Sequence, residues 1–206
     1  MQTQVNFDRA ATLNLTMVGG AGGSIPDHMS YTIFNTGLLP NGMQRISGGS
    51  LTGPNRTISS LYPYLSGYQL WAGSCTDADP QGQKPTGGPY YPGATRDPAL
   101  PTTPGGATTG NINMPSLLVN VQKAGVPLAG AKVFVFHQPD TNGCTSGQTW
   151  TLAGTTDVNG NIMGALPYGL WEVHVTGQTP TSGVWPTITL NPPYTQPAKS
   201  VNVAVN

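Results

Sequence analysis

The chain has 206 residues, of which only 8% are charged, and its eight basic and eight acidic side chains give a formal net charge of zero. Soluble domains average about 25% charged residues, so Thr, Ser, Asn, Gln and Gly must cover most of this surface, as is common in exported or assembled proteins. Eight scattered Lys and Arg residues do not form the dense basic patch that nucleic-acid binding needs, so we expect no nucleic-acid partner.

Short alternating stretches in the first part of the chain predict β-strands. TLNLTM at 12–17 alternates apolar and polar residues, and YTIFN at 31–35 and YQLWAG at 68–73 are bounded by turn residues. We find no window with apolar residues at i, i+3, i+4 and i+7 between capping residues, which is the pattern of an amphipathic helix. These stretches predict an N-terminal β-domain over residues 1–80.

Residues 81–110 are rich in proline and glycine and have no hydrophobic period. Proline cannot donate a hydrogen bond to a sheet ladder, so a central strand is not expected here. The segment predicts an extended linker or a long surface loop between two domains. Tyr90 and Tyr91, in GPYYPG, give it aromatic side chains that could be buried or exposed.

A clearer strand pattern begins after Met114. SLLVNVQ at 116–122, LWEVHV at 170–175 and SVNVAVN at 200–206 each alternate between apolar and polar residues. In LWEVHV the tryptophan and both valines share one face, and the glutamate and histidine share the other. Six or seven short strands separated by Gly, Pro and Asn turns predict a β-sandwich over residues 111–206.

This second part resembles the carboxypeptidase-regulatory-like, transthyretin-like β-sandwich. VPLAGAKVFVF, GTTDVNG and LPYGLWEVHV follow the order of the family's elements G-x-P-L-x-G-A-x-V, T-T-D-x-N-G and L-P-x-G-x-W/Y-x-V. The matching residues are Gly125, Pro127, Gly130, Ala131, Thr156, Asp157, Gly160, Leu166, Pro167 and Gly169. The resemblance covers about 90 residues and implies this sandwich fold for the second part. Together with the N-terminal β-domain it predicts an all-β protein with two Ig- or transthyretin-like sandwich domains. It implies little about function, because this module is an accessory unit in many exported proteins.

The first part adds a second resemblance. LYPYLSGYQLWAGSCTDADP at 61–80, followed by a Gly/Pro-rich segment and this module, is similar to minor pilin-like ectodomains of the type IV pilus modification, PilV type, in Gram-positive bacteria. The resemblance implies a non-catalytic structural ectodomain of a surface appendage, located outside the cell, with other filament subunits as partners. Those proteins carry an N-terminal prepilin helix, which is absent from this sequence.

Membrane and export signals are absent from the sequence itself. It shows no signal peptide at its start and no run of 18 apolar residues. We expect no direct membrane insertion by this chain, and export through an upstream signal or anchor.

The titratable residues do not suggest catalysis or metal binding. His28, His137 and His174 are scattered, and no zinc-ligand spacing is present. Asp157 in TTDVNG is a single carboxylate, whereas a calcium loop normally supplies several, so a β-turn is the favoured interpretation. We therefore expect no enzyme activity, no metal and no cofactor.

A Lys–Asn isopeptide bond, formed beside a buried acid, occurs in related surface-adhesin β-sandwiches. Lys123, Lys132, Glu172 and Asn202 are the available residues. Lys132 and Glu172 are out of phase with the core residues beside them, so we do not expect the bond.

A carbohydrate-binding or adhesive module is the alternative function. Tyr90, Tyr91 and Tyr194 lie in proline-rich loops on an uncharged, amide-rich surface and could stack on a surface glycan. The favoured interpretation is that these tyrosines pack against the sandwich. An aromatic platform exposed on one face would favour adhesion, and its absence would favour a structural role.

Cys75 and Cys144 are the two cysteines of the chain. Each lies at the edge of a polar loop without a cationic neighbour or a helix that would favour a thiolate. In a chain that looks exported they predict one disulfide, with a buried unreactive thiol as the alternative for Cys75. Such a bond would tie the two domains together across the linker and would stabilise the fold by roughly 4 kcal/mol in the chain-entropy estimate.

Overall fold

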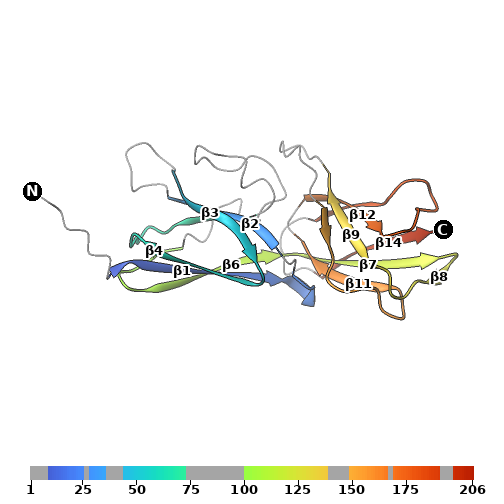
Figure 1. The fold of residues 1–206 in the computed structure, drawn as a ribbon, viewed down its shortest axis with the longest axis horizontal. Coiled ribbons are helices and arrows are strands. Elements are labelled where there is room, and N and C mark those ends of the chain that lie inside the picture. Colours follow the sequence, from blue (N-terminus) through green and yellow to red (C-terminus); the bar gives the residue numbers. More distant parts are fainter. Residues whose placement is uncertain are drawn as a thin grey trace, which may run out of the picture.

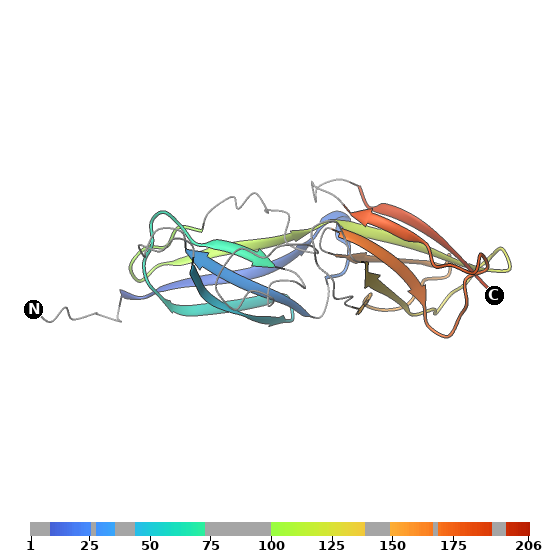
Figure 2. The same cartoon turned by 90° about the horizontal axis from the view of Figure 1, so that it is seen from above.

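The computed structural model describes residues 9–25, 28–35, 44–72, 100–138, 149–166, 169–190 and 197–206. Within these ranges every element is a β-strand except one short 3-10 turn, η2 (Gly20–Gly22), which confirms the predicted all-β class. The strands form an elongated molecule in which two pairs of sheets follow one another along the long axis (Figures 1 and 2).

The N-terminal half contains two three-stranded sheets. One sheet has the order β4-β1-β6 and the other the order β3-β2-β5. β1 pairs antiparallel with β4 and parallel with β6. The strands are β1 (Ala11–Gly19), β2 (His28–Asn35), β3 (Gln44–Thr52), β4 (Asn55–Leu61), β5 (Gln69–Ala72) and β6 (Ala107–Met114).

The C-terminal half contains two four-stranded sheets. The first has the order β11-β7-β14, with β8 paired to the end of β7, and the second has the order β10-β9-β12-β13. β7 is central and pairs antiparallel with β11 and parallel with β14. The strands are β7 (Ser116–Lys123), β8 (Val126–Pro127), β9 (Val133–His137), β10 (Thr149–Thr151), β11 (Asn161–Ala165), β12 (Gly169–Val175), β13 (Thr187–Leu190) and β14 (Lys199–Val205).

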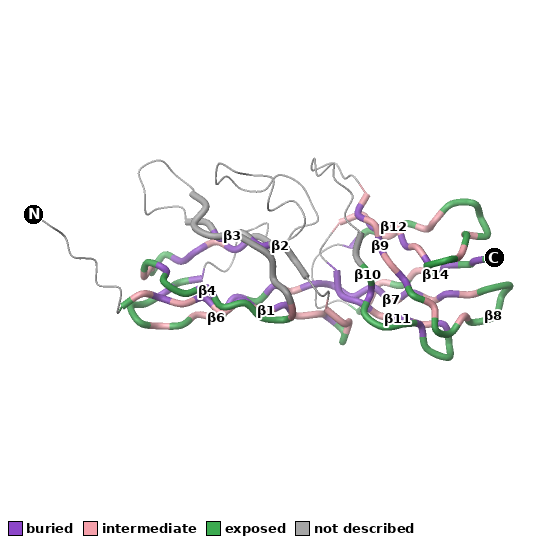
Figure 3. Tube along the Cα trace, viewed as in Figure 1, coloured by how far each residue is buried: buried purple, intermediate pink, exposed green. Residues whose placement is uncertain are grey.

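The cores follow the period-two pattern of the sequence. In β1, β7 and β12 every second residue is buried and the residues between them are partly exposed (Figure 3). Trp171 and Tyr68 are the largest fully buried side chains. The alternation predicted for TLNLTM, SLLVNVQ and LWEVHV is therefore confirmed.

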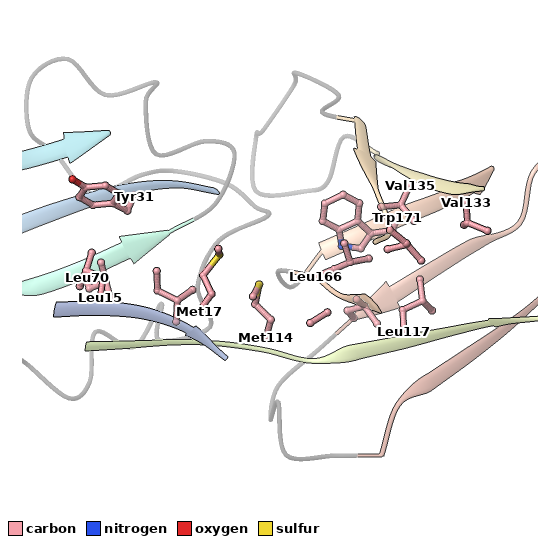
Figure 4. Packing of buried hydrophobic residues seen from close by; sticks show 14 of the residues in the cluster. Leu15, Met17, Tyr31, Leu70, Met114, Leu117, Val133, Val135, Leu166 and Trp171 are labelled. Carbon is pink, nitrogen blue, oxygen red and sulfur yellow. The ribbon is translucent and has the colours of Figure 1, made fainter. Parts of the chain in front are cut away.

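One long strand connects the halves. β6 and β7 are separated only by Pro115 and run the length of the molecule as a spine, defined here as residues 107–123 (Figures 1 and 2). Met17 and Met114 lie between the core side chains of the two halves (Figure 4), and the buried residues of both halves form one cluster. Pro115 lies where the spine stops pairing with β1 and begins to pair with β14. Proline has no backbone N–H to donate, and at this position neither ladder needs one.

The start of β6 overlaps the end of segment 81–110, for which the sequence predicts a linker or long loop. β6 begins at Ala107, and Leu100 pairs with Tyr68, so both ends of the stretch 100–110 belong to the N-terminal half. Residues 111–114, expected at the start of the second domain, are also part of β6. Residues 81–99 lie outside the described ranges, and the division into domains 1–80 and 111–206 stays a prediction.

Candidate functional site

The site residues proposed from sequence cannot be placed. Cys75, Cys144, Tyr90, Tyr91 and Tyr194 lie outside the described residues, so the disulfide and the glycan contacts stay predictions. In the described ranges no three His, Cys, Asp or Glu side chains come together as a metal site. None of the described elements is a helix with the length and hydrophobicity needed to cross a membrane.

Asp157 forms a turn, as the sequence indicated. Its Oδ1 accepts hydrogen bonds from the backbone N–H groups of Asn159 and Asn161, both at 2.8 Å, and the Gly160 N–H donates to the Asp157 carbonyl at 2.9 Å. The carboxylate is thus used to fix the backbone between β10 and β11.

Thr156, its neighbour in the same motif, connects two segments of the C-terminal half. It is 4% exposed, and its Oγ1 donates to the carbonyl of Leu128 at 2.5 Å and accepts from the Ala131 N–H at 2.9 Å. The residues that carry the family resemblance here have a structural role.

The four residues considered for an isopeptide bond are not arranged for one. Lys132 and Asn202 are exposed, and the Lys123 ammonium donates to Gln178 Oε1 at 3.1 Å. Glu172 is partly exposed, with its Oε1 2.5 Å from Nε2 of His174. The core-facing positions of β7 and β14 are apolar, so no buried acid lies beside a Lys–Asn pair among these residues.

The aromatic segment LYPYLSGY anchors the end of the expected linker. Tyr68 exchanges two backbone hydrogen bonds with Leu100, and its hydroxyl donates to the carbonyl of Tyr62 at 2.5 Å. Burial raises the pKa of Tyr68, and the neighbouring Tyr64 and Tyr62 raise it further. Tyr64 packs edge-on against Tyr68, with ring centroids 5.7 Å apart. Leu61 and Tyr68 of this segment therefore belong to the core of the N-terminal half, whereas Tyr62 and Leu65 are exposed.

The junction between the halves is the first candidate functional feature. We define it as Gly19–Ser24 together with Ser116 and Met163–Ala165. Ser24 bridges to Gly164 in parallel, its carbonyl accepts from the Ala165 N–H at 2.8 Å, and its hydroxyl donates to the Met163 carbonyl at 2.9 Å. The buried Ser116 hydroxyl donates to the carbonyl of Gly20. The chain leaving β1 therefore adds to the sheet edge of the other half.

Glycine is required in the junction by close packing. Gly19 has φ −86° and ψ 127°, and Gly23 has φ −61° and ψ 136°, which any residue can adopt. A Cβ at Gly19 would overlap the Gly23 carbonyl oxygen, and a Cβ at Gly23 would overlap Ser116 Oγ. At Gly19 and Gly23 there is therefore no space for a side chain, and the chain leaving β1 packs tightly against the other half at these two positions.

An aromatic row on the C-terminal half is the second candidate. His174 stacks on Phe134 with centroids 4.8 Å apart, and Trp185 lies against the His174 ring at 4.7 Å. The three residues are partly exposed on the outward side of the β9–β12 pair. Beside Trp185 lies an open groove of about 420 Å³, and no lining residue is charged. The groove is lined by Pro180, Thr181, Ser182, Val184, Trp185, Pro186, Asn202 and Ala204.

Sequence reasoning placed His174 on the outward face but missed this row. The signal that could have found it is the cross-strand pairing of β9 with β12, which sets His174 opposite Phe134. Trp185 comes from the loop before β13, and no local pattern brings a loop residue to that face.

No protein-family model and no curated protein matches the chain. Among solved structures, the chain is similar to the Bacillus anthracis TIE protein, with 14% identity, a TM-score of 0.28, and coverage of 96% of this chain and 34% of that one. It is also similar to a streptococcal ancillary pilin (10% identity, TM-score 0.32, 96% of this chain and 63% of that one). A third is the shaft pilin SpaA of Lactobacillus rhamnosus GG (10% identity, TM-score 0.29, 96% and 98%).

The chain thus spans about a third of the first of these structures and less than two thirds of the second. TM-scores at this level do not establish a shared arrangement of the whole chain.

Proposed function

We propose that this chain is a non-catalytic structural ectodomain of a bacterial surface appendage, exported to the cell surface and packed against other filament subunits. The observation that carries the proposal is the connection between the halves. A continuous spine and a closely packed junction join two sheet pairs into one elongated body. An elongated body whose halves share one long strand and one buried cluster is suited to holding its two ends apart in a filament.

The low charge supports the same role. With 8% charged residues, this surface can contact neighbouring subunits through amide and hydroxyl groups without long-range repulsion between identical copies. The finer assignment, a minor subunit of the PilV type, is part of the proposal and rests on the sequence resemblance.

Immunogold electron microscopy of intact cells tests the surface role. An antibody against the chain should label appendages on unbroken cells, with a strain lacking the gene as the control. Labelling found only after lysis would contradict the proposal. For the PilV-type assignment, the complete coding region should encode a prepilin cleavage site and an apolar helix upstream of residue 1, and their absence would remove that assignment.

Glycan binding is a second candidate function, favoured by the aromatic row. Aromatic faces stack on the apolar faces of sugar rings, and the groove beside Trp185 adds hydroxyl and amide groups from Ser182 and Asn202 without any charge. We propose a neutral surface glycan as the ligand at this face. The role of Tyr90, Tyr91 and Tyr194 in such binding stays part of this proposal.

A glycan array followed by NMR titration of the best ligand tests the second function. Trp185→Ala should abolish binding, while Val158→Ala, which changes a side chain 84% exposed in a separate turn, should leave it intact. Equal binding by both variants, or no binding to any neutral glycan, would exclude this face as a glycan site.

A further inference from the structure

The terminal strands of the described chain both lie parallel to the spine. β1 pairs with β6 in one unbroken register from Thr12↔Ala107 to Gly19↔Met114. β14 pairs with β7 from Lys199↔Leu117 to Val205↔Lys123. Each ladder joins a terminal strand to one half of a single continuous strand.

We propose that these two ladders make the chain a mechanical clamp, which resists tension applied upstream of β1 and downstream of β14. The start of β1 and the end of β14 lie at opposite ends of the molecule (Figures 1 and 2). Tension would pull β1 back along β6 and pull β14 forward along β7. Both movements slide one strand along its neighbour, so each ladder is loaded in shear.

Shear loading is the strong direction of a sheet. When a strand slides, all the hydrogen bonds of its ladder are strained together, whereas a strand that is peeled from one end loses them one pair at a time. The eight register pairs of β1 with β6 and the seven of β14 with β7 would act together. The force then passes from one ladder to the other through covalent bonds of the spine, across Pro115.

Neighbouring contacts oppose the same sliding. β1 is also held by β4 on its other edge. β14 is held on its second edge by a hydrogen bond from Thr181 N–H to the Ala204 carbonyl at 2.9 Å and by one from Asn206 N–H to the Thr179 carbonyl at 3.0 Å. The core-facing side chains of the ladders, among them Leu13, Leu15 and Val203, must leave their packed positions before either strand can slip.

The rest of the chain is bypassed while the ladders hold. The segments 20–106 and 124–198 connect the paired strands, and neither is stretched end to end until a ladder breaks, although β4 and Thr179–Thr181 support the terminal strands from the side. Cys75 and Cys144 both lie in these bypassed segments. The clamp therefore does not depend on a disulfide, and it does not depend on the identity of the appendage proposed above.

Single-molecule force spectroscopy of the full chain tests the clamp. The pulling geometry from both termini loads the ladders in shear. A second geometry uses an azide-bearing residue at Val126, 64% exposed beside the Lys123 end of β7, together with the C-terminus. These two handles lie at the same end of the β7–β14 ladder, so β14 is peeled. Azide attachment leaves the cysteines unmodified, and a reductant removes any contribution of a crosslink.

The rupture force should be several-fold higher from the termini than from Val126 and the C-terminus at the same loading rate, with no lengthening before the first terminal rupture. A second peeling geometry, which pulls between an azide at the exposed Val158 in the turn before β11 and the C-terminus, should also give low rupture forces. Equal forces in the terminal and peeling geometries, or gradual lengthening of the chain before the first terminal rupture, would overturn the proposal. Far-UV circular dichroism of each azide variant checks that it is folded.

Discussion

Replacing Gly19 by alanine tests the packing of the junction. The backbone of Gly19, with φ −86° and ψ 127°, is extended and suits alanine. If a Cβ had room there, the change would stabilise the protein by about 0.4–1 kcal/mol, because the unfolded chain would lose conformational entropy. The junction predicts the opposite sign, since the Cβ would overlap the Gly23 carbonyl oxygen and lie 3.0 Å from the Ala165 Cβ.

The size of the effect follows from what must move. The main obstacle is a backbone oxygen, which cannot rotate away as a flexible side chain could. Overpacking of this kind costs about 1–3 kcal/mol, and a backbone obstacle favours the upper end. After subtracting the entropy gain, we expect Gly19→Ala to destabilise the fold by about 2 kcal/mol. For a protein of this size that lowers the melting temperature by about 6 °C.

Gly22→Ala is the matched control, three residues along the same segment. Gly22 has φ 78°, and no heavy atom lies within 4 Å of the position of an added Cβ. Alanine there meets only backbone strain, which costs about 1 kcal/mol. Calorimetry and urea unfolding of both variants should therefore rank Gly19→Ala as the more damaging. If Gly19→Ala were neutral or stabilising, or milder than Gly22→Ala, the junction would not be packed as described.

Three further predictions concern other residues. Thr156→Val should cost about 1–3 kcal/mol in urea unfolding, because it leaves a partly buried carbonyl and N–H unpaired; a neutral result would remove the turn-anchoring role. The pKa of Tyr68 is raised in the folded protein, so the tyrosine stabilises the fold fully at a pH below its unfolded-state pKa and loses this effect as the pH rises through its folded-state pKa. The unfolding midpoint should therefore fall more steeply in alkaline solution for the unsubstituted protein than for Tyr68→Phe. The unfolded, non-reduced chain should take up no thiol label at Cys75 or Cys144, and two labels would exclude the disulfide.

The strands could be predicted from sequence where one face is buried. LWEVHV has three apolar residues at alternate positions, and the structure buries Trp171 and Val173 completely. Such a pattern is local, since the side chains of one strand alternate whatever the strand pairs with. The same holds for Leu13 and Leu15 in β1. The all-β class and the positions of β1, β7 and β12 follow from this one physical fact.

The pairing of β1 with β6 could not be predicted in this way. The strand ATTGNINM is half polar, contains a glycine at 110 and follows a proline-rich segment, so its local pattern is that of a loop. It becomes a strand because it pairs with one edge of β1 and because the side chains of Ile112 and Met114 are buried in the core. The junction was missed for the same reason. GGAGGS has no hydrophobic pattern, and its role depends on a backbone approach to Ser116 and Gly164 that only the folded chain reveals.

The long connections between the paired strands, which contain β2 to β5 and β8 to β13, follow from the two parallel ladders. Antiparallel neighbours can be joined by a tight turn, but parallel neighbours need a connection that returns to the starting end of the sheet. In this chain β1 and β6 are separated by 87 intervening residues and β7 and β14 by 75, counted from the limits of the strands. Loop-closure entropy grows only slowly with length, so such connections are tolerated once the ladders form. The proline- and glycine-rich composition that first suggested a flexible linker is therefore compatible with a rigid spine, because those segments connect the strands without carrying the load between the two ends of the molecule.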